Sequence, residues 1–123
     1  ILKDLTFKPP VILIEGGFAF SPKLKSSVQP TVSAAYQQPL NYIYETALDL
    51  EYIPVCFYQD TYLIRKDLSK DFIRFNSEEL YSDAWYFMPE YEKKYLMNLR
   101  RDSKIIKSIE LENLGSFNSH PLL

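Results

Sequence analysis

The chain has 123 residues, a formal net charge of −2, three glycines and one cysteine. One cysteine excludes an internal disulfide framework, and three glycines exclude the glycine-rich loops that bind phosphates. No apolar run approaches the roughly 18 residues that cross a bilayer, and a dedicated nucleic-acid binder would carry an excess of positive charge.

Hydrophobic residues make up 46% of the chain, so we expect a packed core. The first patterned segment is residues 11–14, a continuous aliphatic run that ends at Glu15 and Gly16. Successive residues of a strand point to opposite faces, and here the residues on both faces are apolar. The run therefore predicts a strand buried on both faces. Residues 21–39 contain Pro22, Pro30, Pro39 and several serines, and we expect a long ordered connection there.

The hydrophobic period changes to that of a helix at residue 40. Five residues fall on one helical face over residues 40–50: Leu40, Ile43, Tyr44, Ala47 and Leu48. Residues 53–58 and 61–65 are rich in strand-forming side chains, and Gln59 with Asp60 between them predicts a hairpin.

The segment 77–101 predicts two helices that meet at Pro89, because proline is tolerated in the first turn of a helix. Asn76 and Glu79 have the spacing of a capping box at the start of the first helix. Residues 104–111 alternate only partly, but they favour a late strand.

We therefore expect an α+β fold with a small, mainly antiparallel sheet of about four strands, near residues 10–15, 53–58, 61–65 and 104–111. Two to three helices, near residues 40–50 and 77–101, would cover it. The chain would form a single compact domain over residues 1–123, with a frayed tail from about residue 115. The first residue is not methionine, which indicates a processed protein or an excised domain.

Residues that could carry chemistry are few. Cys56 and His120 stand alone and far apart, so we expect no metal site and no cofactor. Glu15 follows an apolar strand, a position where catalytic acids occur in α/β enzymes. The main alternative to a binding function is therefore a small enzyme that acts on a phosphate or ester substrate, with Glu15 as acid or base. We do not favour an enzyme, because no second catalytic member is visible.

Charge is segregated in the C-terminal half. Residues 76–92 contain five acids and no base, whereas residues 93–107 contain six bases and one acid. The basic segment gives a second alternative, a nucleic-acid-binding module. Arg100 and Arg101, followed two residues later by Ser103, resemble the pattern that basophilic kinases phosphorylate, so Ser103 is a candidate phosphosite.

Aromatic residues make up 15% of the chain, and several fall close together in the predicted helices. One helical stripe cannot bury all of them, so part of this aromatic area should lie at a surface. We predict a non-catalytic protein–protein interaction domain, an adaptor or a subunit of a larger assembly, located inside the cell. Its partner surface would consist of Trp85, Tyr86, Tyr91, Tyr95, Arg100 and Arg101.

Overall fold

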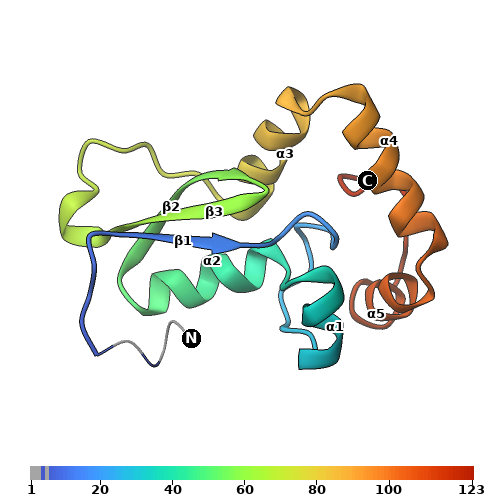
Figure 1. The fold of residues 1–123 in the computed structure, drawn as a ribbon, viewed down its shortest axis with the longest axis horizontal. Helices are drawn as coiled ribbons and strands as arrows, with labels where there is room; N and C mark the ends of the chain where they lie inside the picture. Colours follow the sequence, from blue (N-terminus) through green and yellow to red (C-terminus); the bar gives the residue numbers. More distant parts are fainter. Residues whose placement is uncertain (1–3, 5) are drawn as a thin grey trace.

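The computed structural model describes residue 4 and residues 6–123. Three strands form one antiparallel sheet in the order β1-β3-β2, with bounds Val11–Glu15 (β1), Tyr52–Tyr58 (β2) and Asp60–Arg65 (β3). The helices are α1 (Pro30–Tyr36), α2 (Leu40–Asp49), α3 (Ser77–Phe87), α4 (Glu90–Asp102) and α5 (Lys104–Leu114). A short 3-10 helix, η2 (Lys66–Leu68), follows β3. Figure 1 shows the sheet and α2 at one end of the molecule and α4 and α5 at the other.

The α+β class and the antiparallel sheet are confirmed, with three strands instead of about four and five α-helices instead of two to three. The predicted hairpin between β2 and β3 is confirmed, but Asp60, which was expected in the turn, is the first residue of β3 and pairs with Tyr58. The side chain of Asn76 accepts a hydrogen bond from the Glu79 backbone, while Glu79 reaches back to the Asn76 backbone N–H. This reciprocal capping box starts α3 at the predicted residue.

The predicted late strand is wrong, because residues 104–111 belong to helix α5. The Ser103 hydroxyl accepts a hydrogen bond from the Ile106 backbone N–H and so caps the first turn. Gly115 ends the helix with a left-handed φ of 75°. The expected connection over residues 21–39 contains one further helix, α1, which opens with Pro30 and has no buried residue.

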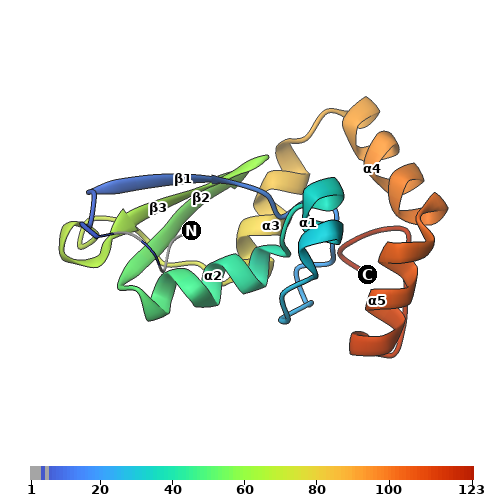
Figure 2. The same cartoon turned by 60° about the horizontal axis from the view of Figure 1, so that its bottom comes forward.

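Within the described residues, strand β1 is covered on one face only, which corrects the prediction of burial on both faces. Helix α2 lies along one side of the sheet, and Figure 2 shows no helix on the other side. Val11 and Leu13 point to the uncovered side and are 57% and 55% exposed. Ile12 and Ile14 face α2 and pack with the buried residues Ala47, Tyr52 and Leu63.

The core consists of three clusters rather than one. The first lies under α2, and the second joins α2, β2 and α3 through Leu40, Phe57 and Tyr81. Gly17 sits against this second cluster, where a Cβ atom would come within 3.0 Å of Leu40 and of the Phe57 ring. The third cluster packs the segment around Phe20 against α5.

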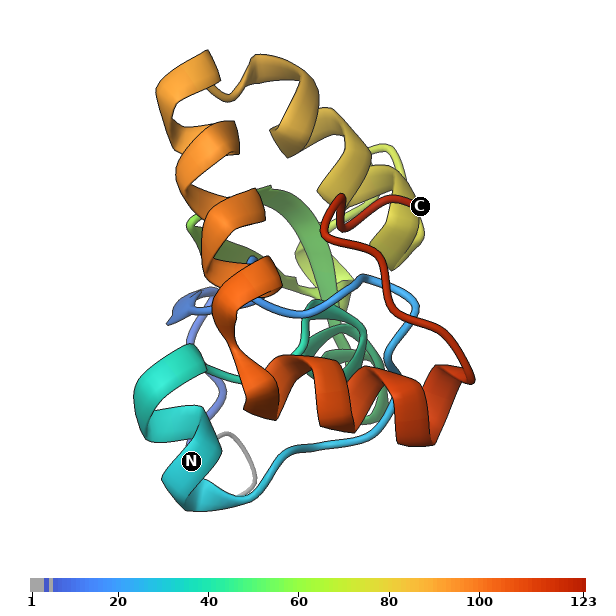
Figure 3. The same ribbon diagram turned by 90° about the vertical axis from the view of Figure 1, so that its right-hand side faces the viewer.

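The C-terminal segment is packed against the protein rather than frayed. Figure 3 shows it returning from the end of α5 toward α3. Pro121 is buried, and Leu122 packs against the cluster between α2, β2 and α3. The His120 ring packs against the Trp85 ring in a tilted arrangement, with 4.8 Å between centroids and 52° between the ring planes.

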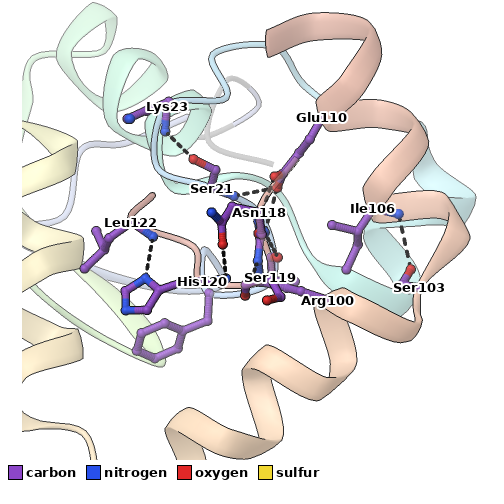
Figure 4. A network of polar contacts seen from close by, with 12 residues as sticks. Ser21, Lys23, Arg100, Ser103, Ile106, Glu110, Asn118, Ser119, His120 and Leu122 are labelled. Carbon is purple, nitrogen blue, oxygen red and sulfur yellow. Dashed lines mark hydrogen bonds and ion pairs between the residues drawn. The ribbon is translucent and has the colours of Figure 1, made fainter. Parts of the chain in front are cut away.

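A buried ion pair holds this end of the molecule together (Figure 4). The Arg100 guanidinium donates to both carboxylate oxygens of Glu110, each at 2.7 Å. Its remaining N–H groups donate to the backbone carbonyls of Ala19, Asn118 and Ser119. The pair therefore joins α4, α5, the segment after β1 and the C-terminal segment at one point.

Candidate interaction surface

Four aromatic side chains project into solvent where α3 passes into α4. Tyr86 and Phe87 end α3 and are 76% and 70% exposed, and Tyr91 and Tyr95 on α4 are 73% and 69% exposed. The rings of Tyr86 and Phe87 meet edge to face with 5.1 Å between centroids. We call these four residues the elbow aromatics.

Helical geometry explains why these rings face outward. On α3 the buried stripe is Leu80, Tyr81 and Ala84, so the last two residues of the helix point away from the core. On α4 the buried residues are Leu96 and Arg100. Tyr91 and Tyr95 are four residues apart and therefore share another side of the same helix. Phe87 was missing from the predicted surface, although its position beside Tyr86 was a signal for it.

Trp85 does not belong to the elbow aromatics. It is half-buried and packs on the cluster that contains Leu80 and Tyr81. His120 covers part of its ring, and the Lys93 ammonium lies 5.8 Å from the ring centroid. The structure thus places three of the four predicted aromatic residues in solvent and the fourth at the edge of the core.

An apolar groove of about 420 Å³ lies beside α4. Met88, Leu96 and Leu99 line it from the helical side, and Tyr95 also borders it. The opposite wall comes from segments distant in sequence, namely Phe18, Ala19, Ala35, Tyr36, Gln37 and Gln59. Glu92 is the one charged residue in this lining.

Glu92 also links α4 to the hairpin. The Tyr58 hydroxyl donates to one carboxylate oxygen of Glu92 at 3.0 Å, and the Tyr91 hydroxyl donates to the other at 3.4 Å. The hydrogen bond to Glu92 raises the pKa of Tyr58 above its ordinary value. The Tyr58 phenol therefore stays protonated at neutral pH and keeps its hydrogen bond to Glu92 on α4.

The predicted basic residues separate in the fold. Arg100 is only 1% exposed and pairs with Glu110, so it does not reach the surface on which the sequence placed it. Arg101 is exposed, and its Nε lies 3.1 Å from Oδ1 of Asp102. The Lys107 ammonium lies over the Phe117 ring. With the Lys93 ammonium 5.8 Å from the Trp85 ring centroid, four of the six bases in residues 93–107 contact other described side chains.

Ser103 is 7% exposed, and its hydroxyl is occupied twice. It accepts the capping hydrogen bond from Ile106 and donates to the Tyr36 hydroxyl at 3.1 Å. A kinase would reach this oxygen only after the first turn of α5 had opened.

Glu15 is exposed at the end of β1, opposite Asp60 of β3. Gln37 donates a hydrogen bond to its carboxylate at 3.5 Å. The hollow next to it has a volume of about 290 Å³, and no serine, cysteine, histidine or lysine lines it. Asp60 also lines this hollow, so the fold places a second carboxylate beside Glu15.

In the described part of the chain, no three histidine, cysteine, aspartate or glutamate side chains come together as metal ligands. No helix there combines the length and apolarity of a membrane span.

Comparison with protein-family models, curated proteins and solved structures found no match to the chain.

Proposed function

We propose that this protein is a non-catalytic protein-interaction domain that serves as an adaptor or as a subunit of a larger assembly. The main observation behind the proposal is that Tyr95, which is largely exposed, borders the apolar groove of α4, and that exposed Tyr91 lies one turn before it on the same helix. Tyrosine buries a large area while it loses few rotamers, and it is enriched among residues that dominate interface energies. An apolar side chain of a partner would enter the groove while the two tyrosines cover it.

The charges around α4 support an oriented complex. Glu90 is exposed at the start of α4, next to the elbow aromatics, whereas Arg101 is exposed in the last turn of α4 and Lys104 at the start of α5. Opposite charges separated in this way steer a partner and select one orientation over the reverse. We also propose an intracellular location, which the exposed free thiol of Cys56 supports, because reducing compartments keep such thiols unpaired.

The test begins with a photoreactive aromatic residue in place of Tyr95 and, in a control protein, of exposed Phe72. Irradiation in cell extract identifies a protein that is captured from position 95 and not from position 72. Calorimetry with that purified protein then compares the parent with Tyr91→Ala/Tyr95→Ala. The matched control is Phe72→Ala/Ile73→Ala, which removes two exposed apolar side chains elsewhere.

We expect the tyrosine double variant to bind at least about tenfold more weakly, as loss of interface hot spots does. The control variant should bind like the parent. Equal affinity of the parent and the tyrosine double variant would contradict the proposal. Capture at both positions, or at neither, would contradict it as well.

A further inference from the structure

A second groove, of about 700 Å³, lies between β2 and α3. On one side it is bounded by residues 55–57 of β2, and on the other by the exposed side of α3. Buried Leu80 and half-buried Leu122 give it an apolar base, and Phe75 lies at the end where α3 begins. Figure 1 shows α3 next to the hairpin that contains β2.

Strand β2 is an edge strand, because the sheet order is β1-β3-β2. Pro54 and a register shift between Pro54 and Cys56 disrupt the first half of this edge. From Cys56 to Tyr58 the pairing with β3 is regular again. Among the described residues, this part of β2 makes no backbone hydrogen bond outside the sheet. A free edge of this kind can pair with an additional extended chain.

The wall opposite this edge is acidic. Glu78, Glu79 and Asp83 line the groove, and its lining contains no lysine, arginine or histidine. Glu79 is held by the capping box, but neither Glu78 nor Asp83 forms an ion pair with a described residue. Two carboxylates beside a strand edge therefore have no counter-charge within the described part of the chain.

We propose that this groove binds an extended segment of a partner protein that carries lysine or arginine at alternate positions and adds to β2 as a fourth strand. Successive side chains of a strand point to opposite faces, so every second residue of the added strand would face α3. Basic side chains at those positions meet Glu78 and Asp83, and their aliphatic stems cover Leu80. The backbone supplies affinity and the alternating charges supply selectivity. This site is separate from the groove of α4, so it does not depend on the proposed function.

The probe is a fluorescent eight-residue peptide in which lysine and valine alternate, titrated with the full chain and followed by anisotropy. Two peptide controls separate the contributions: glutamate replaces lysine in one, and alternate backbone amides are methylated in the other. Cys56 is the single cysteine, lines the groove and is exposed, so its rate of modification by a thiol reagent reports where the peptide binds.

Glu78→Lys/Asp83→Lys should weaken binding about tenfold, since two favourable charge pairs become repulsive. The matched control, Asp49→Lys/Glu112→Lys, has the same net charge and changes exposed acids on α2 and α5. Glu78→Gln/Asp83→Asn provides a milder variant, with weaker binding than the parent, if the lysine variant does not fold. Circular dichroism verifies that each variant is folded.

We expect the lysine peptide to bind, to slow Cys56 modification and to lose affinity when its backbone is methylated. The glutamate peptide should not bind. The proposal is overturned if the lysine peptide fails to bind, if the methylated peptide binds equally well, or if Cys56 stays unprotected. Equal affinity of the parent and the groove variants for the lysine peptide would overturn it as well.

Discussion

Arg100 and Glu110 lie ten residues apart in the chain and face each other inside the protein through two N–H···O bonds of 2.7 Å. Each residue is only 1% exposed. All five N–H groups of the guanidinium have an acceptor, and Glu110 also accepts from the Ser21 backbone N–H at 2.8 Å. Buried charges are stable only when they are compensated to this degree.

Replacing Glu110 by glutamine leaves the Arg100 charge buried without its counter-charge. We expect Glu110→Gln to lower the free energy of unfolding by about 3 kcal/mol, measured by urea denaturation. Asp102→Asn, which breaks the exposed pair with Arg101, should cost less than about 1 kcal/mol. Similar losses in the two variants would contradict the role given to burial.

Removing both charges of the buried pair should not restore stability. Arg100→Met/Glu110→Leu deprives the Ala19 carbonyl and the Ser21 N–H of their partners inside the protein. Because unsatisfied buried polar groups cost about 1–3 kcal/mol each, we expect a loss of at least about 2 kcal/mol. A double variant as stable as the parent in urea would show that these backbone groups find other partners.

Ser103 caps α5, and we expect its replacement to lower the stability of the protein. Ser103→Ala removes the cap and the hydrogen bond to Tyr36, and it should lower the free energy of unfolding by about 1–2 kcal/mol. A basophilic kinase should modify a free peptide of residues 97–108 much faster than the folded chain, because the hydroxyl is enclosed in the fold. Equal rates in radiolabel incorporation would contradict this enclosure.

The buried phenol of Tyr81 should make the free energy of unfolding depend on pH in alkali. Burial raises the pKa of its phenol, which is fully enclosed and donates a hydrogen bond to the Phe18 carbonyl. The folded state therefore holds this proton more tightly than the unfolded state does. The resulting stability is complete below the ordinary tyrosine pKa of about 10 and is lost as the pH rises above it.

Urea midpoints measured from pH 8 to pH 11 should therefore fall above about pH 10. Tyr81→Phe should be less stable by about 1 kcal/mol at pH 8 and should fall less steeply in alkali. Tyr86→Phe, at an exposed position, serves as the control and should follow the parent. Parallel curves for the parent and Tyr81→Phe would contradict the prediction.

The packed C-terminal segment predicts the effect of deleting residues 116–123. The deletion removes the Asn118 and Ser119 carbonyls from Arg100 and uncovers the Trp85 ring. We expect a loss of at least about 2 kcal/mol in urea and a red shift of the emission of Trp85, the only tryptophan. His120→Ala should shift the emission with a smaller loss of stability. An unchanged spectrum and midpoint after deletion would show that this segment is not packed.

Most individual elements were predictable because their signals are local. The period of α2, the alternation in the hairpin and the capping box of Asn76 depend on residues close together in sequence. Helix α5 was mistaken for a strand because the partial alternation of residues 104–111 favoured a strand, whereas its buried residues, Ile106 and Glu110, are four apart as on one side of a helix. Arg100 was placed on the partner surface because arginine is common at interfaces, and its buried partner Glu110 was not foreseen.

The candidate surface was predictable only in part. An excess of aromatic residues over what one stripe can bury indicated exposed rings, and Tyr86, Tyr91 and Tyr95 are exposed. Trp85 is half-buried because the C-terminal segment folds back over α3. His120 of this segment covers the Trp85 ring, and Leu122 packs in the same cluster. The groove of α4 likewise needs a wall from residues 18–19 and 35–37, which no helical pattern in α4 can reveal.

The sequence by itself determined the α+β class, the helices on either side of Pro89 and the ring-rich composition of that region, because periodicity and capping act within a few residues. Only the tertiary structure decided which charges are buried and which rings are free. Those outcomes rest on contacts between distant segments, such as Ser21 with Glu110, 89 residues apart, and Ala19 with Arg100, 81 apart. A buried charge is stable only when such partners converge on it, and no local pattern records where they come from.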